Sequence, residues 1–311
     1  MLILPHRLGA ALVLFIALML PACQSRSSDA QPAPAASTAA ITSGGQERTY
    51  DIYQPARLNR PAPLVIMMHG GGGNAGNAAR MSGFNALAER EGFVAVYPDG
   101  TGRTRLLTWN AGHCCAYAME DGVDDVAFLS DLIDDLVARG TADERRVYLT
   151  GMSNGAMMTF RAGRELSGKV AAIAPVVGAM FGDELPATSP VAALIITGAQ
   201  DANVPSAGGY GDLPRWRDTP SDAPYAPAGA TFDYWASVNQ CASRAVTASN
   251  AVLQQHEGER CAAPVTWVHL KENGHAWPGG EKGSRRGDAP VDTYNASEEI
   301  WAFFENQRLV R

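Results

Sequence analysis

"VYLTGMSNGAMM", residues 147–158, joins a strand-like apolar run to a helix-like apolar run through the pattern G-x-S-x-G. In a sharp strand-to-helix turn of this kind, the serine hydroxyl is presented at the end of the strand. Gly151 and Gly155 lie two residues either side of Ser153 and leave room for neighbouring backbone. The same pattern also occurs in turns that are simply built from small residues. Here its position between a strand and a helix favours Ser153 as a nucleophile.

Strand-like and helix-like segments alternate on both sides of this turn. Strands are expected at 49–55, 63–69, 93–99, 146–151, 170–178, 191–198 and 265–271. Helices are expected at 76–90, 123–139, 154–166, 229–239 and 295–307. Near-continuous apolar strands that alternate with helices indicate a parallel sheet covered on both faces, in a single domain. The polar segment 202–228 lacks periodicity, and loops of that length are usually functional or disordered.

A serine nucleophile needs a base, and the base needs an acid that orients it. "ALIITGAQDANVP", residues 193–205, places Asp201 just beyond a strand, and "LKENGHAWPGG", residues 270–280, places His275 in a Gly-rich loop before the last helix. The chain order serine, acid, histidine is the one that accompanies this type of turn. We therefore expect Ser153, Asp201 and His275 to form a catalytic triad.

Other histidines and acids fit these roles less well. His269 is expected within an alternating strand and His256 in a polar loop. His113 precedes the serine in the chain, and His6 lies in the N-terminal segment. His69 ends a strand and is expected to make a structural hydrogen bond. Asp124 and Asp125 stand at a helix start, where acidic residues more often cap the helix.

A run of four glycines follows the strand at 63–69. In "VIMMHGGGGNAGN", residues 65–77, Gly71, Gly73 and Gly76 fit the spacing G-x-G-x-x-G of a dinucleotide-binding turn. No acid stands at a strand end about twenty residues later, and no G-K-[ST] follows for a Walker loop. A loop of this composition can also hold an oxyanion. We expect that second use, with the backbone N–H groups of Gly71 and Asn154 as donors.

The first 46 residues are expected to direct and tether the protein. His6 and Arg7 precede the apolar run of residues 8–20, which is too short for a stable membrane span, and "LPAC" then ends at Cys23. Residues 1–23 thus resemble a bacterial lipoprotein signal with a lipidated Cys23, and ordinary signal cleavage near Ala22 is the alternative. Residues 24–46 are rich in Ala, Ser, Pro and Gln, so a flexible tether is expected, followed by one catalytic domain at 47–311.

Composition and cysteines narrow the class of protein. The 311 residues carry a net charge of −7 and contain no Lys/Arg block, so the pattern typical of nucleic-acid binding is absent from the sequence. Five cysteines fit an oxidising, extracytoplasmic compartment. With Cys23 lipidated, three pairings of the other four are possible, and we favour Cys241–Cys261. The adjacent Cys114 and Cys115 form either a vicinal disulfide or free thiols, and no zinc-type spacing is present.

Several motifs in register resemble one family. "HGGGGN", "WNAGHCC", "VDDVAFLSDLIDDL", "GMSNGAMM", "TGAQDANVP" and "GHAWPGG" are similar to the secreted esterases that include poly(3-hydroxybutyrate) depolymerases, bacterial feruloyl esterases and acetyl-xylan esterases. The chain also resembles hydrolases of oxidised poly(vinyl alcohol), which cleave a C–C bond between carbonyls. The resemblance implies an α/β-hydrolase fold, with Ser153, Asp201 and His275 as triad. The family's helix before Cys241 supports the Cys241–Cys261 pairing.

These observations predict an extracytoplasmic serine hydrolase of carboxylic esters that needs no cofactor or metal. Its expected partner is an ester-containing polymer or oligomer, and contact with a membrane is expected only through a lipid anchor. Two alternatives remain: a β-diketone C–C hydrolase, and a non-catalytic surface-binding protein on the same fold. Five aromatic residues are placed in loops at the carboxyl edge of the sheet: Trp109, Tyr210, Trp216, Tyr225 and Trp277. Trp109 and Trp277 are the expected substrate contacts.

Overall fold

A computed structural model describes residues 1–2, 36–212 and 223–309. The chain divides into Met1–Pro32 and Ala33–Arg311, and the description below concerns the second unit. The predictions for Cys23 and Trp216 fall outside the described residues. No helix in the described part of the chain is both long and apolar enough to cross a membrane.

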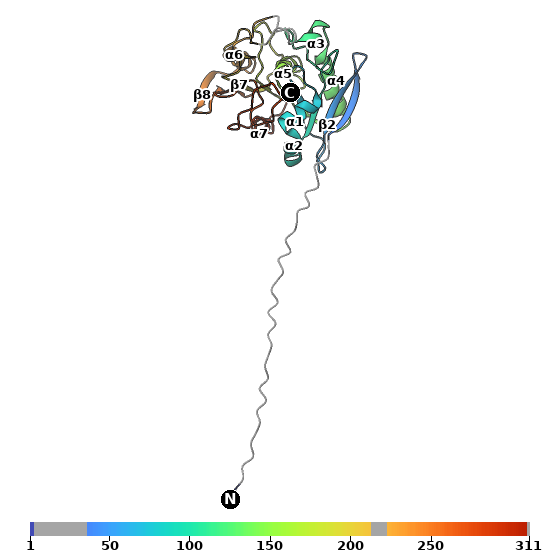
Figure 1. Ribbon diagram of the computed structural model, residues 1–311, viewed down its shortest axis with the longest axis vertical. Coiled ribbons are helices and arrows are strands. Elements are labelled where there is room, and N and C mark those ends of the chain that lie inside the picture. Colours follow the sequence, from blue (N-terminus) through green and yellow to red (C-terminus); the bar gives the residue numbers. More distant parts are fainter. Residues whose placement is uncertain (3–35, 213–222, 310–311) are drawn as a thin grey trace. The chain divides into compact units, whose positions relative to one another are not determined.

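A ten-stranded sheet in the order β1-β2-β4-β3-β5-β6-β7-β10-β9-β8 runs through the unit (Figure 1). The strands are β1 (Ser37–Ser43), β2 (Gln46–Tyr53), β3 (Ala62–Met68), β4 (Val94–Pro98), β5 (Ala142–Met152), β6 (Ala172–Val176), β7 (Ala192–Gly198), β8 (Ser243–Ser249), β9 (Leu253–Glu259) and β10 (Val265–Leu270). The central strands from β4 to β10 are parallel, and antiparallel strands extend both ends. Their carboxyl ends therefore meet at one edge.

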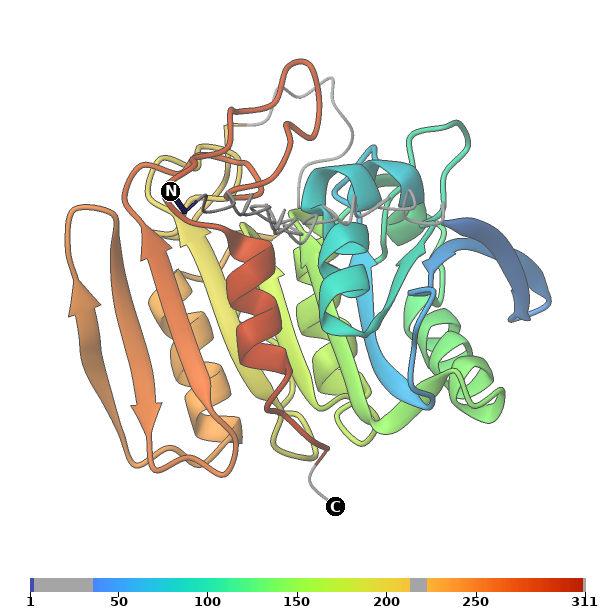
Figure 2. The same ribbon diagram turned by 90° about the horizontal axis from the view of Figure 1, so that it is seen from below.

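Helices cover both faces of this sheet, and Figure 2 shows α1, α2 and α7 on one side with α4, α5 and α6 on the other. Their bounds are α1 (Ala75–Ser82), α2 (Phe84–Glu91), α3 (Ala116–Glu120), α4 (Asp125–Ala138), α5 (Asn154–Glu165), α6 (Ala228–Val238) and α7 (Ala296–Phe304). The expected α/β fold with helices on both faces of a mostly parallel sheet is confirmed.

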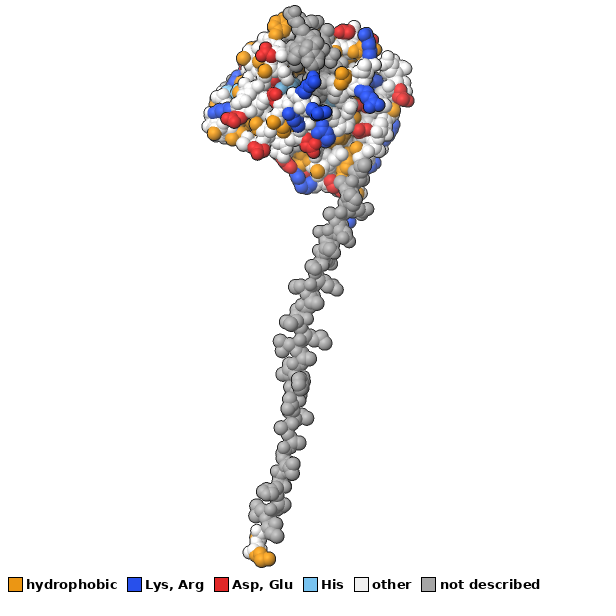
Figure 3. Space-filling view, in the orientation of Figure 1, with side chains coloured by type: hydrophobic (Ala, Val, Ile, Leu, Met, Phe, Trp, Pro, Cys, Tyr) orange, Lys and Arg blue, Asp and Glu red, His pale blue; other side chains and the backbone are white. Residues whose placement is uncertain are grey.

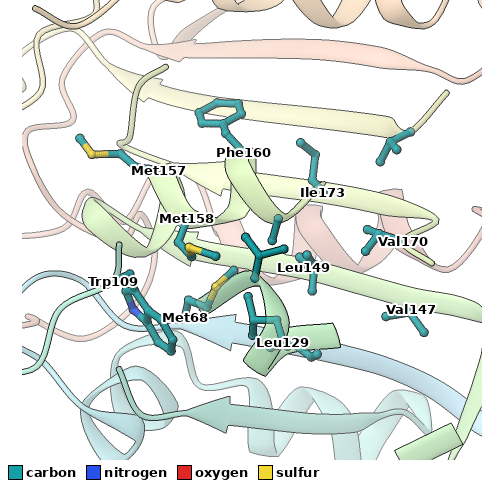
Figure 4. Close-up of a cluster of buried hydrophobic side chains, with 14 of the residues drawn as sticks. Met68, Trp109, Leu129, Val147, Leu149, Met157, Met158, Phe160, Val170 and Ile173 are labelled. Carbon is teal, nitrogen blue, oxygen red and sulfur yellow. The ribbon is translucent and has the colours of Figure 1, made fainter. Parts of the chain in front are cut away.

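The core lies in two layers because successive side chains of a strand point to opposite faces. In β3, Leu64 and Ile66 face the cluster beneath α4, α5 and α6, while Val65 and Met67 face the cluster beneath α1, α2 and α7. Figure 4 shows the first layer, where Met68, Leu129 and Leu149 lie together with Met157, Met158 and Phe160 of α5. Burial on both faces explains why these strands have near-continuous apolar sequences.

Three expectations for secondary structure are corrected. The helix expected at 76–90 is two helices, because Gly83 has a left-handed backbone with φ 66° that ends α1 before α2 begins. Residues 37–43, expected to belong to the tether at 24–46, instead form β1, which pairs along its length with β2 in an antiparallel hairpin, and residues 24–35 lie outside the described part of the chain. Strands β8 and β9 were not expected, because their sequences are polar and half-exposed.

The surface of the folded unit is mixed in charge. Lys and Arg side chains gather near the middle of the face shown in Figure 3, with Asp and Glu among and around them. Pairs such as Arg80–Glu281 (3.0 Å) join two exposed side chains. Exposed pairs of this kind contribute little to the free energy of unfolding, because both ions remain hydrated. The stability of the unit therefore rests on its buried layers.

Candidate active site

The turn between β5 and α5 holds Ser153 in a strained backbone conformation. Its φ of 57° and ψ of −122° lie in a region that costs a non-glycine residue on the order of 1–3 kcal/mol. Its N–H donates to Val176 O at 3.1 Å, which ties the turn to the end of β6. A Cβ on Gly155 would overlap the carbonyl oxygens of Met68 and His69. The flanking glycine is therefore required by the approach of β3.

Three side chains from distant parts of the chain meet at this turn. The Nε2 atom of His275 lies 2.8 Å from Ser153 Oγ, and its Nδ1 atom lies 2.8 Å from Asp201 Oδ2. The Asp201 side chain is 1% exposed and the His275 side chain 12% exposed. The structure thus brings together Ser153, Asp201 and His275, the three residues expected to form a triad, in a continuous hydrogen-bonded chain.

Asp201 is fixed by the loop that follows β7. Asp201 Oδ1 accepts hydrogen bonds from the backbone N–H groups of Asn203 (2.9 Å) and Val204 (2.8 Å). With one carboxylate oxygen held by two N–H groups, the other oxygen is left to face the imidazole. The two hydrogen bonds therefore set the orientation of the carboxylate toward His275.

The loop that carries His275 is anchored from inside by Asn273. This residue is fully buried, and its Nδ2 donates to the carbonyls of Gly274 (2.8 Å) and Ala276 (3.1 Å) on either side of His275. Its backbone carbonyl accepts the N–H of Gln200 at 3.0 Å. The side-chain amide of Asn273 thus shapes the short turn that presents the imidazole, and its backbone carbonyl joins that turn to the loop of Asp201.

The glycine run lies against the same turn. A Cβ on Gly71 would stand 3.7 Å from Asn154 Cβ, and one on Gly70 would stand 3.5 Å from Ser153 Cβ. Within the run, the N–H groups of Gly72 and Gly73 are already engaged, by Leu107 O (2.8 Å) and Gly70 O (2.9 Å). The run is therefore a folded loop that lies directly beside Ser153 and Asn154.

Asn154 holds the segment at 109–115 against the start of α5. Its side chain accepts the N–H of Trp109 at 2.7 Å and donates to Trp109 O at 3.0 Å. It also lies 3.8 Å from Cys114 Sγ, and Cys114 is joined to Cys115 in a vicinal disulfide.

Cys241 and Cys261 form a second disulfide, and both sulfur atoms lie against Gly258 of β9.

His69 makes structural hydrogen bonds, as expected. Its Nε2 accepts the N–H of Gly100 at 3.0 Å, and its Nδ1 lies 2.8 Å from Gly70 O, so a neutral ring protonated on Nδ1 satisfies both. Complete burial lowers the pKa of His69 to about 4, although the Asp99 carboxylate opposes this. His69 therefore supports the glycine run as a neutral ring.

Asp124 and Asp125, set aside as helix-start residues, have different roles. Asp124 caps α4 by accepting the N–H of Ala127 at 2.9 Å. Asp125 is buried, pairs with Arg48 of β2 at 2.7 Å, and accepts the N–H of Asn110 at 2.8 Å. Burial raises the pKa of Asp125, and the charge of Arg48 opposes that rise. This buried pair ties the 109–115 segment to the first hairpin.

The two expected substrate contacts are corrected. Trp277 is 1% exposed, its ring meets the Phe84 ring edge-on, and its Nε1 donates to Ser297 Oγ at 3.0 Å. Trp109 is fully buried and donates from Nε1 to His69 O at 3.0 Å. Both rings are core residues, because Trp109 packs in the cluster beneath α4, α5 and α6 and Trp277 in the cluster beneath α1, α2 and α7.

A groove runs along α5, beginning one helical turn beyond Ser153. Its volume is about 480 Å³, and it lies between the 110–119 segment and the loop after β6. The lining includes Met157, Phe160, Arg161, Phe181 and Asp183. Sequence reasoning missed it because its walls come from three separate segments. No group of three His, Cys, Asp or Glu side chains suited to a metal occurs in residues 36–212 and 223–309.

Comparisons with known proteins identify the family of the chain. The family model described as Esterase PHB depolymerase matches residues 48–207, about half of the chain. A bifunctional acetylxylan esterase/xylanase, XynS20E of Neocallimastix patriciarum, is 31% identical over 157 residues, which cover 50% of this chain and 22% of that protein. Feruloyl esterase B of Piromyces equi is 26% identical over 232 residues, which cover 72% of this chain and 41% of that protein. The chain thus matches less than half the length of either relative.

A solved structure shares the fold. The acetyl xylan esterase from Aspergillus awamori superposes with a TM-score of 0.59 at 15% identity, over 86% of this chain and 99% of that one. This likeness supports the architecture and carries no argument about substrate. From the match at 48–207 and from the fold, the chain belongs to the Esterase PHB depolymerase family of carboxylic ester hydrolases and has the α/β-hydrolase fold.

Proposed function

We propose that the protein is a serine hydrolase that cleaves carboxylic esters through a covalent acyl-enzyme. The observation that carries this proposal is the hydrogen-bonded chain from Asp201 through His275 to Ser153, with 2.8 Å at each step. Such a chain supplies a nucleophile, a base and an orienting acid within reach of one another. The strained turn at Ser153 adds support, because strain of this kind is retained where it positions a reacting group.

In the proposed reaction, Ser153 Oγ attacks the ester carbonyl while His275 Nε2 accepts its proton. Asp201 holds the imidazole with Nδ1 protonated and stabilises the imidazolium that forms. Collapse of the tetrahedral intermediate breaks the bond to the alkoxy oxygen, which leaves as the alcohol after receiving the proton from His275. Water then attacks the acyl-enzyme by the same steps and releases the carboxylic acid.

We propose the backbone N–H groups of Gly71 and Asn154 as the oxyanion donors. Asn154 is the first residue of α5, so its N–H has no carbonyl acceptor within the helix. The N–H groups of Gly72 and Gly73 already donate to Leu107 O and Gly70 O, and Gly71 is the residue of the run that stands beside Asn154. A donor in such a position contributes roughly 3 kcal/mol to transition-state stabilisation.

The substrate we propose is an ester of a polymer or oligomer, such as an acetylated or feruloylated polysaccharide or a hydroxyalkanoate chain. The names of the two relatives support the first class, and the family description supports the second. The groove along α5 also supports an extended substrate, because it offers about 480 Å³ of space beginning near Ser153. Its ion-paired side chains and its two Phe rings suit a neutral chain with both polar and apolar groups.

One purified sample can test both the mechanism and the bond type. We expect a fluorophosphonate probe to label the wild type, and Ser153→Ala to abolish labelling and lower kcat by several orders of magnitude. Ser237→Ala, at an exposed serine of α6, is the matched control and should behave as wild type. Near-normal turnover by folded Ser153→Ala would overturn the mechanism. Faster turnover of a β-diketone than of acetyl, feruloyl and hydroxybutyrate esters would replace ester cleavage with C–C hydrolysis.

We further propose that the protein acts outside the cytoplasm, anchored through a lipidated Cys23. Stable anchoring needs more than one acyl chain, as a lipoprotein has. We expect Cys23→Ser to move the protein from the membrane fraction to the soluble fraction. Soluble wild-type protein with an unmodified Cys23 would instead indicate simple secretion.

A further inference from the structure

The loop that carries the base has a second anchor, on its outer side. The backbone N–H of His275 donates to Asp288 Oδ2 at 2.7 Å. Asp288 is an exposed residue in the long connection between β10 and α7. Figure 2 shows this connection, in orange-red, rising above the edge where the parallel strands end. A carboxylate thirteen residues later in the chain therefore holds the backbone of the histidine itself.

Gly274 makes this contact possible. A Cβ added at Gly274 would overlap Asp288 Oδ2 and would stand 3.0 Å from its Cγ. Distances this short require one of the two groups to move. The backbone at Gly274 is thus shaped to receive the Asp288 carboxylate closely.

We propose that Asp288 is a positioning residue for His275, an inference that rests on the proposed serine-hydrolase function. Asp201 fixes the imidazole through Nδ1, and Asn273 fixes the turn from the buried side. Asp288 holds a third point of the same loop, the backbone N–H of His275. With this contact in place, Nε2 stays within hydrogen-bonding distance of Ser153 Oγ during both proton transfers.

The inference predicts a change in kcat rather than in KM. Displacing a reacting group by about 1 Å can cost on the order of 100-fold in rate. We expect Asp288→Ala to lower kcat by roughly 10- to 100-fold with KM nearly unchanged, because the residue acts on the base and not on bound substrate. Asp288→Asn keeps an oxygen acceptor for the N–H and should retain kcat within about three-fold of wild type.

A double-mutant cycle with Gly274 gives the sharper test. Gly274→Ala should lower kcat because its Cβ displaces the carboxylate. In an Asp288→Ala background the same substitution should cost little more, since the atoms that it overlaps are gone. The two effects should therefore be strongly non-additive, as expected for residues in direct contact.

The experiment compares Asp288→Ala, Asp288→Asn, Gly274→Ala and the double variant Gly274→Ala/Asp288→Ala with wild type. The control is Asp292→Ala, at an exposed aspartate four residues further along the same connection. Each variant is measured for kcat, KM, the rate of fluorophosphonate labelling and the midpoint of thermal unfolding. A kcat loss confined to Asp288→Ala and Gly274→Ala, with rescue by Asn and unchanged midpoints, supports the inference. Equal activity of Asp288→Ala and wild type, additive effects in the cycle, or an equal loss in Asp292→Ala would overturn it. Failure of wild type to react with the probe would instead overturn the proposed function.

Discussion

Replacing Trp277 separates a role in the core from a role in the substrate pocket. The indole is 1% exposed and packs in the layer beneath α1, α2 and α7. Its Nε1 donates to Ser297 Oγ, which in turn donates to Ser82 O at 2.6 Å. Through these two bonds, the ring links the base loop to the start of α7 and the end of α1. We therefore expect substitution to destabilise the fold and to leave substrate selectivity unchanged.

The size of the effect follows from burial. A Trp side chain buries roughly 150–250 Å², which at about 25 cal/mol per Å² corresponds to roughly 4–6 kcal/mol as an upper bound. Measured losses for Trp→Ala in cores run at about 3–5 kcal/mol. Trp277→Phe keeps an aromatic ring but removes the donor to Ser297, so a loss of about 1–3 kcal/mol is expected.

The assay is urea unfolding at constant pH, combined with KM for a bulky aromatic ester and for a short acetate ester. Trp277→Phe should lower the unfolding midpoint with an unchanged m-value, and the ratio of the two KM values should match wild type. Ser297→Ala serves as a partner control, because it removes the acceptor and should cost a similar amount. An unchanged midpoint together with a higher KM for the bulky ester alone would refute the core assignment.

Two further predictions concern buried charge. The pKa of a histidine is near 6.5 in the unfolded chain, whereas that of His69 in the folded protein is about 4. Unfolding therefore takes up a proton between pH 6.5 and pH 4. As the pH falls through this window, His69 lowers the free energy of unfolding by roughly 3 kcal/mol in full. In urea titrations, His69→Gln should flatten the slope between about pH 5 and 6.5, and an unchanged slope would contradict the low pKa. Asp125→Asn should leave the Arg48 guanidinium buried without its counter-charge and cost about 3–5 kcal/mol by urea unfolding, whereas a loss below about 1 kcal/mol would show that water reaches the pair.

Much of the architecture was predictable from local patterns in the sequence. Strands β3, β4 and β7 are buried along their whole length, so their apolar composition alone identifies them. The serine, acid and histidine positions follow from strand ends and their loops, because chain order constrains which loop supplies which group. Each of these features is encoded in one short stretch of sequence, so it can be predicted without knowing which other segments that stretch contacts.

The misses have a different physical cause. The aromatic residues Trp109 and Trp277 occur in Gly-rich loops, which usually lie at the surface, yet their rings turn inward to close the core. The strand at Ser37–Ser43 has few apolar residues, and its partner β2 defines it. In each case, contacts with a distant segment determine the orientation of the side chain or the secondary structure, and these contacts cannot be predicted from local composition.

Two glycines mark positions where a distant segment closely approaches the site. Gly155 and Gly274 stand beside residues of the proposed triad, and a Cβ at either would overlap an oxygen from a distant segment. At Gly155 the oxygens belong to the end of β3, and at Gly274 the oxygen belongs to Asp288. A glycine next to a catalytic residue can therefore mark the approach of a supporting group as well as a need for flexibility. Because the carboxylate at Gly274 also holds the N–H of His275, the same close approach that excludes a side chain there fixes the position of the base.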